Sequence, residues 1–343
     1  MNQEQEPNTP DNDNLNHADT AHQPNHPPQA AALCQSIHDE LRKVFFGQEQ
    51  VVKQVLAALL SGGHVLLEGK PGLGKTHLVI ALANTFGGQF GRIQFTPDLM
   101  PSDVTGFTLF DMKSQTFQMR RGPVFTNLLL ADEINRAPAK TQAALLEVMQ
   151  EQQVTIDGES MKLEMPFMTL ATQNPIEQEG TYPLPEAQLD RFLMKVVIDY
   201  PDQASEEQVV REVTMEASAK GLDAHSVERI CSQQEIIKAQ QETAGIKAVP
   251  EVVHYAVNIC RATRDAQGIS LGASTRGAIS LIQVAKAYAL MSGRDFVTPD
   301  DVKSAALPVL RHRVQLAPEL VISGQNIDDA ITHIINTVQA PRV

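Results

Sequence analysis

The chain has 343 residues, 42% of them hydrophobic, with 41 acidic against 28 basic residues and a formal net charge of −13. This length exceeds one compact core and predicts about two domains. The excess of acidic over basic residues argues against electrostatic binding of nucleic acid over a broad surface. The sequence has no long uncharged apolar run and begins with polar and acidic residues, so we expect neither a membrane-spanning helix nor a signal peptide. Cys34, Cys231 and Cys260 are odd in number and far apart, which disfavours a disulfide framework or a zinc site; together these features favour the cytoplasm.

The first 30 residues are rich in Asn, Gln, Pro, Asp and His and nearly lack large apolar side chains. Such a segment cannot bury enough surface to offset the entropy lost on ordering. We therefore predict a disordered polar tail over residues 1–30. His17, His22 and His26 could suggest a metal site, but composition alone explains them as part of a solvated polar tract.

A helical pattern follows this tail. Leu33, Ile37, Leu41 and Val44 recur at the spacing that places side chains on one face of a helix. A glycine interrupts the pattern, and a second helix is predicted over residues 48–60. The short Ser-Gly-Gly stretch after that helix then leads into an apolar strand.

The segment after this strand is a candidate phosphate-binding loop. Residues 69–76 read Gly-Lys-Pro-Gly-Leu-Gly-Lys-Thr, which matches G-x-x-x-x-G-K-[ST], with a strand before and a helix after. Its glycines let backbone N–H groups approach phosphate oxygens, Lys75 can reach the β- and γ-phosphates, and Thr76 offers a hydroxyl to Mg²⁺. The predicted nucleotide-binding residues are Gly69, Pro71, Gly72, Leu73, Gly74, Lys75 and Thr76, with Gly47 and Gln48 expected near the adenine.

Two carboxylates follow a second apolar strand. Residues 125–131 form a nearly continuous apolar run of the kind that is buried on both faces of a parallel sheet, and Asp132 and Glu133 end it. Open α/β sheets bind ligands at this end of their strands. We therefore predict that Asp132 holds Mg²⁺ through water and that Glu133 orients and deprotonates an attacking water.

Another strand over residues 167–171 is followed by Asn174. Beside the acidic strand, Asn174 could polarise the same water or touch the γ-phosphate. It could equally be a turn-forming Asn before proline, and the sequence leaves both readings open. Alternation predicts β-hairpins over residues 107–119 and 153–163, the second around an Asp-Gly turn.

Near residue 202 the predicted secondary structure changes from mixed helix and strand to helix alone. A short helix at 186–192 and a strand at 193–198 precede this point, and only helices are expected after it. Those helices are predicted at residues 205–215, 234–241, 250–264, 274–291 and 299–311.

With these residues in view, the chain resembles AAA+ ATPases, and among them the MoxR family, over about residues 33–314. The resemblance is carried by residues 67–76, 130–138, 141–147, 171–186 and 189–192. It implies an α/β AAA+ core with a central parallel sheet and inserted β-hairpins at residues 31–202. An all-α lid domain is implied at residues 203–343.

The resemblance also implies roles for single residues. Asn174 matches the family's first sensor, and Arg276 matches the second sensor. Arg191 matches the arginine finger, which acts on the nucleotide of the neighbouring subunit, and Arg136 falls in a motif expected to contact that subunit. Arginine suits such roles because it brings a fixed charge and several donors to the γ-phosphate.

The implied activity is Mg²⁺-dependent ATP hydrolysis by a homo-oligomeric ring, usually a hexamer, with heterologous contacts between subunits. The implied role is chaperone-like: maturation of enzyme complexes or insertion of their metal cofactors. The implied partners are proteins with von Willebrand factor A domains. The two hairpins resemble the family's extra hairpins, which contact partners or line a central pore.

Three other functions stay open. One is a motor subunit like that of magnesium chelatase, which shares this architecture. Another is a nucleic-acid motor or transcription activator, disfavoured by the acidic balance and the absence of a GAFTGA loop. The last is a scaffold that binds ATP without turnover.

Overall fold

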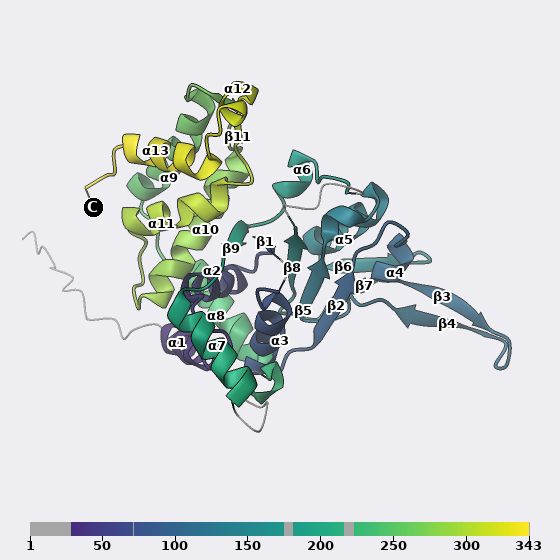
Figure 1. Cartoon of the computed structure of the whole chain (residues 1–343). Coiled ribbons are helices and arrows are strands. Elements are labelled where there is room, and N and C mark those ends of the chain that lie inside the picture. Colours follow the sequence, from purple (N-terminus) through teal and green to yellow (C-terminus); the bar gives the residue numbers. More distant parts are fainter. Residues whose placement is uncertain (1–28, 71, 175–180, 216–222, 343) are drawn as a thin grey trace, which may run out of the picture.

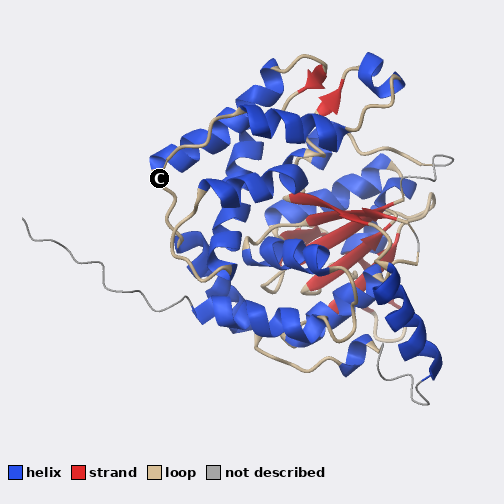
Figure 2. Ribbon diagram, turned by 60° about the vertical axis from the view of Figure 1, so that its left-hand side comes forward, coloured by secondary structure: helices blue, strands red, loops and turns tan. Residues whose placement is uncertain are grey.

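The computed structural model describes residues 29–342, apart from residues 71, 175–180 and 216–222. At its centre is a five-stranded sheet in the order β2-β5-β8-β1-β9, with every neighbouring pair parallel. Figure 2 shows helices on both faces of this sheet. The strands are β1 (Val65–Gly69), β2 (Phe90–Gln94), β5 (Leu128–Asp132), β8 (Met168–Gln173) and β9 (Met194–Ile198).

Alternate side chains of the inner strands β1, β5 and β8 enter two separate apolar clusters. Leu67 and Leu130 belong to the cluster shared with α1 (Gln29–Leu41), α2 (Glu49–Leu60) and α3 (Lys75–Thr85). Leu66 and Leu129 belong to the cluster shared with α5 (Ala139–Glu151). Because successive strand residues point to opposite faces, an apolar run is what a sheet covered on both sides requires.

Both predicted hairpins are confirmed. The first pairs β3 (Gly106–Asp111) with β4 (Thr116–Arg121), follows α4 (Pro101–Thr105) and projects away from the body (Figure 1). The second pairs β6 (Gln153–Ile156) with β7 (Glu159–Lys162) across the predicted Asp-Gly turn, whose two residues have φ of 50° and 86°. Glycine tolerates such a left-handed conformation without a steric penalty.

The C-terminal part is helical, as expected, except for one small sheet. Strands β10 (Ile269–Leu271) and β11 (Gln315–Leu316) pair antiparallel, so the expectation of helices alone was wrong in this detail. Strands of three and two residues are too short to show a period-two pattern. The helices are α7 (Gln203–Met215), α8 (Gln233–Gly245), α9 (Pro250–Asp265), α10 (Thr275–Met291), α11 (Pro299–Leu310), α12 (Pro318–Ile322) and α13 (Ile327–Thr337).

The boundary between the two parts is bridged by apolar packing. Helices α1 and α2 pack against α8 and α10, and one apolar cluster runs through both parts. The division at residue 202 stays a prediction, and α7 begins at residue 203. The predicted tail lies outside the described residues, apart from its last two positions, which belong to α1.

Two further findings concern the helices and the cysteines. Among the described residues, no helix combines the length and apolar character needed to cross a membrane. Cys34, Cys231 and Cys260 are all buried free thiols. Burial raises the pKa of Cys34 to about 12 and that of Cys231 and Cys260 to about 11, so these thiols are unreactive near neutral pH.

His64, just before β1, joins three elements of the core. Its Nδ1 accepts the Thr169 N–H of β8 at 2.9 Å, so its Nε2 carries the proton and donates to the Met149 carbonyl of α5 at 3.0 Å. The ring is fully buried, and desolvation lowers its pKa to about 4, against a small opposing effect of the bond to Met149. The folded protein therefore holds His64 in its neutral form.

This burial predicts a pH-dependent stability. An unfolded chain protonates His64 near pH 6.5, whereas the folded chain does so only near pH 4, so the free energy of unfolding falls as pH decreases through that window. Between pH 7 and pH 5 the contribution of His64 should be about 2 kcal/mol. Denaturant unfolding of His64→Gln, which keeps a donor and an acceptor, should show a correspondingly weaker pH dependence.

The matched control is His254→Gln, a change on the exposed side of α9. It should leave the pH dependence of the wild type unchanged. Equal pH dependence of the wild type and His64→Gln would contradict the assignment to His64.

Candidate functional site

A hollow of about 390 Å³ lies at the carboxyl edge of the sheet, lined by the glycine-rich loop. The loop turns through Gly72 and Gly74, whose φ values are 83° and 75°. A β-carbon on Gly69 would lie 2.5 Å from the carbonyl oxygen of Ile198, and one on Gly74 would lie 3.2 Å from the ring of Phe45. Larger side chains at these two positions would collide with neighbouring parts of the chain, so the loop requires glycine there. The backbone of the loop is a cradle whose N–H groups can approach an anion.

Lys75 supplies a cation inside this hollow. It is the first residue of α3, and its Nζ donates to the carbonyl oxygen of Gly69. Burial lowers its pKa, and the carboxylates of Asp132, Glu68 and Glu133 act in the opposite direction. A partly desolvated ammonium at the N-terminus of a helix is suited to bind a phosphate group.

Asp132 ends β5 beside the loop, and both of its oxygens are held. Oδ2 accepts from Arg92 Nε at 2.9 Å and lies 2.8 Å from Arg92 Nη2, while Oδ1 accepts from the Thr172 hydroxyl at 3.1 Å. These contacts fix the carboxylate toward the hollow that Thr76 also lines.

Glu133 is the next residue and takes a left-handed conformation, with φ of 55°. Its N–H donates to the Thr172 hydroxyl at 2.9 Å. Its Oε2 accepts from Gln94 Nε2 at 2.9 Å and from Arg136 Nη1 at 3.0 Å. A left-handed non-glycine residue is sterically costly, and here it turns the Glu133 side chain into the hollow instead of continuing the strand.

Asn174 lines the same hollow as Lys75, Thr76, Asp132 and Glu133. The reason is the parallel pairing of β8 with both β5 and β1, which brings the three strand ends together. The structure thus brings together residues that lie far apart in the sequence. Pro71 and the part of the motif at residues 175–180 lie outside the described residues.

A second hollow of about 580 Å³ adjoins the first, and Gly72, Gly74 and His77 line both. Its remaining walls are mainly apolar and aromatic. Gln48 lies in its lining, with its side-chain amide bonded to the carbonyl of Asp199. The residues that line only this hollow are Val44, Phe45, Phe46, Gln48, Tyr200, Pro201, Glu206, Val209 and Val210.

The paired hollows fit a nucleotide with Mg²⁺. The polar hollow offers the glycine cradle, Lys75, and oxygen ligands from Thr76 and Asp132, which are of the kind that Mg²⁺ prefers. The apolar hollow suits a base. Between them, buried Nε2 of His77 has no partner among the described residues, although buried polar atoms are normally hydrogen-bonded. That atom is shielded from solvent, so the fit rests on the cradle, Lys75 and the oxygen ligands.

Gly47 is packed beside this region but is not in its lining. Its φ is 68°, and a β-carbon there would lie 2.5 Å from the side chain of Ser205. The position therefore demands glycine for the entry of the chain into α2.

Arg191 and Arg276 lie outside both hollows. Arg191 follows α6 (Glu186–Leu189), and its Nη1 donates to the carbonyl of Leu146 at 3.0 Å. Arg276, in the first turn of α10, is half exposed and lies 3.8 Å from Asp190. Their predicted sensor and finger roles stay predictions.

Sequence reasoning missed Arg92, Gln94 and Thr172. All three line the polar hollow and bond to Asp132 or Glu133. Arg92 and Gln94 are two positions apart, so the sequence indicates that they share one face of a strand. They meet the two carboxylates because β2 pairs with β5, which places Gln94 opposite Asp132. The partner strand of β5, however, could not be known from sequence.

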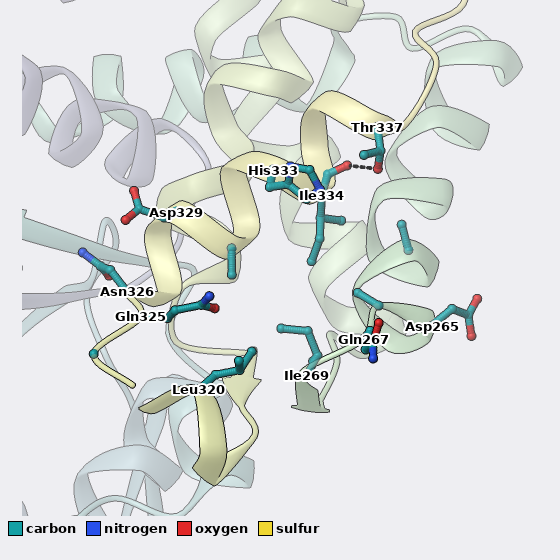
Figure 3. Close-up of a pocket in the computed structure, with 14 residues that line it drawn as sticks. Asp265, Gln267, Ile269, Leu320, Gln325, Asn326, Asp329, His333, Ile334 and Thr337 are labelled. Carbon is teal, nitrogen blue, oxygen red and sulfur yellow. Dashed lines mark hydrogen bonds between the residues drawn. The ribbon is translucent and has the colours of Figure 1, made fainter. Parts of the chain in front are cut away.

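A larger hollow of about 900 Å³ lies in the lid between α9, α12 and α13, far from these residues in the chain (Figure 3). Ile269, Leu320 and Ile334 form apolar wall, while Asp329 and His333 are polar members of the lining. It contains none of the predicted site residues, so its size does not make it the candidate site.

Two family profiles match the chain. The profile described as "ATPase family associated with various cellular activities (AAA)" matches residues 64–194, which carry the sheet and the polar hollow. The profile described as "AAA lid domain" matches residues 261–334, which include α10 and α11. The two matches correspond to the two parts of the fold.

Similar proteins extend over most of the chain. The uncharacterized protein YeaC of Bacillus subtilis is 44% identical over 88% of this chain and 93% of its own. Chaperone MoxR1 of Mycobacterium tuberculosis is 41% identical over 89% of this chain and 81% of its own. A crystal structure of a candidate ATPase from Cytophaga hutchinsonii aligns with a TM-score of 0.84 at 42% identity, covering 91% of this chain and 96% of that one.

The loop geometry predicts a specific loss of ligand binding. Gly74→Ala would force an L-residue into a left-handed conformation and move the Phe45 ring, so affinity for a fluorescent ATP analogue should fall at least tenfold, as about 1.4 kcal/mol of lost contact would give. Gly62→Ala is the matched control, because Gly62 also has positive φ, at 64°, but nothing lies near its β-carbon position. Equal affinity of both variants would contradict a role for the Gly74 geometry.

Proposed function

Because the chain belongs to the MoxR family of AAA ATPases, we propose that it hydrolyses ATP with Mg²⁺ as a ring-forming oligomer and thereby remodels partner proteins. One observation carries the hydrolytic part: Lys75, Asp132, Glu133 and Asn174 line a single polar hollow. A binding site alone would need the loop and Lys75. The carboxylates beside them support turnover, since they offer a metal ligand and a base.

In this proposal the chain's own residues bind and orient the triphosphate. Loop N–H groups, the start of α3 and Lys75 hold the phosphate oxygens, and the apolar hollow with Phe45 and Tyr200 receives the base. Thr76 and Asp132 would hold Mg²⁺, which when bound supplies positive charge to the β- and γ-phosphates.

Glu133 is the proposed general base, and its hydrogen bonds orient it. Its Oε2 accepts from Gln94 and Arg136, and these bonds leave the other carboxylate oxygen, Oε1, to accept a proton from water. Asn174, on the neighbouring strand end, would orient the same water. The base is therefore held in place through one oxygen and acts through the other.

Arg191 and Arg276 are proposed to complete the site at the boundary between subunits. Arg191 lies away from the hollow of its own chain, which supports a role as a finger in the site of the neighbouring subunit. A heterologous contact that closes by rotation gives a ring, which we propose to be a hexamer. Arg276, at the start of a lid helix, would reach the γ-phosphate as the second sensor.

The proposed clients are proteins with von Willebrand factor A domains, including enzymes that receive a metal cofactor. The hairpin of β3 and β4 supports client contact, because it projects from the body and exposes Phe110, Met112 and Phe117 (Figure 1). The name of the mycobacterial relative, a chaperone, supports remodelling in general. The alternatives of a chelatase-like subunit and of a nucleic-acid motor would be recognised by metal insertion into a porphyrin and by DNA-stimulated turnover.

Removing the base should separate binding from turnover. Glu133→Gln keeps the shape of the side chain but cannot accept the proton, so ATP should stay bound while phosphate release falls at least about 100-fold. Phosphate release and retained nucleotide are measured on the same preparation. Glu147→Gln, an exposed change on α5, is the control and should keep wild-type turnover; equal release from wild type and Glu133→Gln would refute the role of Glu133.

The proposed arginine finger, Arg191, should act on the nucleotide bound by the neighbouring subunit. Arg191→Ala should bind ATP but hydrolyse little of it, because transition-state charge loses an arginine that is worth about 10³-fold or more in related phosphoryl transfers. Mixing with Lys75→Ala subunits, which supply an intact Arg191, should restore part of the turnover in a steady-state phosphate assay. Failure of rescue at every mixing ratio would count against the trans assignment.

A further inference from the structure

Residues 312–315, which follow α11, bind the segment around Arg191. Arg313 is the centre of this contact: only 6% of the residue is exposed, and its Nε donates to Asp190 Oδ1 at 2.7 Å. Its Nη1 donates to the Leu193 carbonyl at 3.1 Å, and its Nη2 donates to the Phe192 carbonyl at 2.6 Å. One guanidinium from the lid thus holds the residues on both sides of Arg191.

The neighbours of Arg313 add to the same contact. His312 Nε2 donates to the Phe192 carbonyl at 3.0 Å, and Gln315 Nε2 donates to Glu186 Oε1 of α6 at 3.0 Å. Nη1 and Nη2 of Arg313 also bond within the lid, to the Val309 carbonyl at 2.5 Å and the Ser280 hydroxyl at 3.3 Å. The guanidinium is therefore saturated from both sides, by α10 and α11 and by the segment after α6.

Asp190 is shared by the lid groups. Besides Arg313 on Oδ1, its Oδ2 accepts from the Ser274 hydroxyl at 3.2 Å and lies 3.8 Å from Arg276 Nη1. Asp190 directly precedes Arg191 in the chain. The proposed second sensor and the proposed finger are thus linked through one carboxylate.

The geometry resists independent motion of the two parts. A planar guanidinium has fixed donor directions, so the lid cannot rotate about this contact without breaking several bonds at once. Breaking them would leave a buried charge and buried carbonyl groups without partners, which is costly. The Asp190–Leu193 segment is also fixed to the core, because Phe192 is buried in the apolar cluster of α5 and the Leu193 N–H donates to the His64 carbonyl at 2.8 Å. Arg313 therefore clamps the lid to the core at the residues that flank Arg191.

We propose that Arg313 is a positioning residue that couples the lid of one subunit to the finger it presents to the next. Through this clamp the lid sets the position of Asp190, and with it the direction in which Arg191 is presented to the neighbouring site. This inference rests on the proposed function, because it requires Arg191 to act across the subunit boundary.

The experiment uses mixed full-length subunits. A receiver carries Arg191→Ala, so its intact loop binds ATP but depends on a neighbour's finger. A donor carries Lys75→Ala, so it supplies the finger without turnover of its own. Arg313→Lys is then introduced into the donor or into the receiver, and kcat and KM for ATP are measured for each mixture.

Arg313→Lys in the donor should lower kcat at least about tenfold and change KM less than about twofold. Lysine offers a point charge without the planar fork of arginine, and small displacements of a catalytic group are costly. The same change in the receiver should alter kcat less than about twofold by the same reasoning. A purely structural role would give equal effects in either subunit, and that result would overturn the proposal.

Arg311→Lys is the matched control. Arg311 is also nearly buried, but its ion pair at 2.9 Å is with Asp328 of α13. Its charge also interacts with Glu68 of β1, and no hydrogen bond among the described residues joins it to the Asp190–Leu193 segment. In the donor it should leave kcat unchanged, and a loss equal to that of Arg313→Lys would overturn the proposal.

If the donor with Arg313→Lys fails to fold by circular dichroism, Asp190→Asn in the donor replaces it. This change keeps the side-chain size and the contacts of Arg313 with the Phe192 and Leu193 carbonyls, but it weakens the link of the carboxylate to Arg313. The fall in kcat should therefore again be larger when the change is in the donor than when it is in the receiver. No loss would overturn the role of the link. Absence of turnover in the unvaried mixture, with active wild type, would instead overturn the trans assignment together with this proposal.

Discussion

The site depends on the parallel pairing of β1, β5 and β8, which delivers three polar segments to one edge of the sheet. This register is enforced from outside the site. Leu66 and Leu67 enter opposite apolar clusters, so a slip of one residue would exchange the two faces of the strand. Burial of aliphatic side chains on both faces therefore sets the separation of the loop, Asp132 and Asn174, and the polar residues themselves need only fill positions already fixed.

Features encoded locally could be predicted from the sequence, and features that depend on distant partners could not. The phosphate loop and the Asp-Gly turn of the second hairpin need only a few consecutive residues, and both were predicted with the correct context. By contrast, Arg313 and Asp190 are 123 positions apart, and nothing in either neighbourhood indicates the other. Arg92 was missed for the same reason, since its strand pairing decides that it faces Asp132. The small lid sheet escaped because its strands are too short to show alternation.

Each acidic residue of the proposed mechanism has a cationic partner within the chain. Arg92 holds Asp132, and Arg136 holds Glu133. A hydrogen bond to a charged group contributes about 1.5–3 kcal/mol. Gln94 and Arg136 both bond Oε2 of Glu133, so they fix the direction of the carboxylate and leave Oε1 for a water. The donors around Glu133 therefore orient the base without occupying both of its oxygens.

The two parts of the molecule are joined by contacts of different physical character. The packing of α1 and α2 on α8 and α10 is mainly apolar, with few hydrogen bonds such as that from Gln240 Nε2 to the Leu59 carbonyl at 2.7 Å. Apolar contact is non-directional, so it tolerates small sliding. The contact between Arg313 and the Asp190–Leu193 segment is directional and saturated, so it does not. A lid attached in this way can shift over the helices at one side while staying fixed to the finger segment at the other. The strain of any lid motion must then fall on the Asp190–Leu193 segment itself, which contains Arg191 and leads directly into β9.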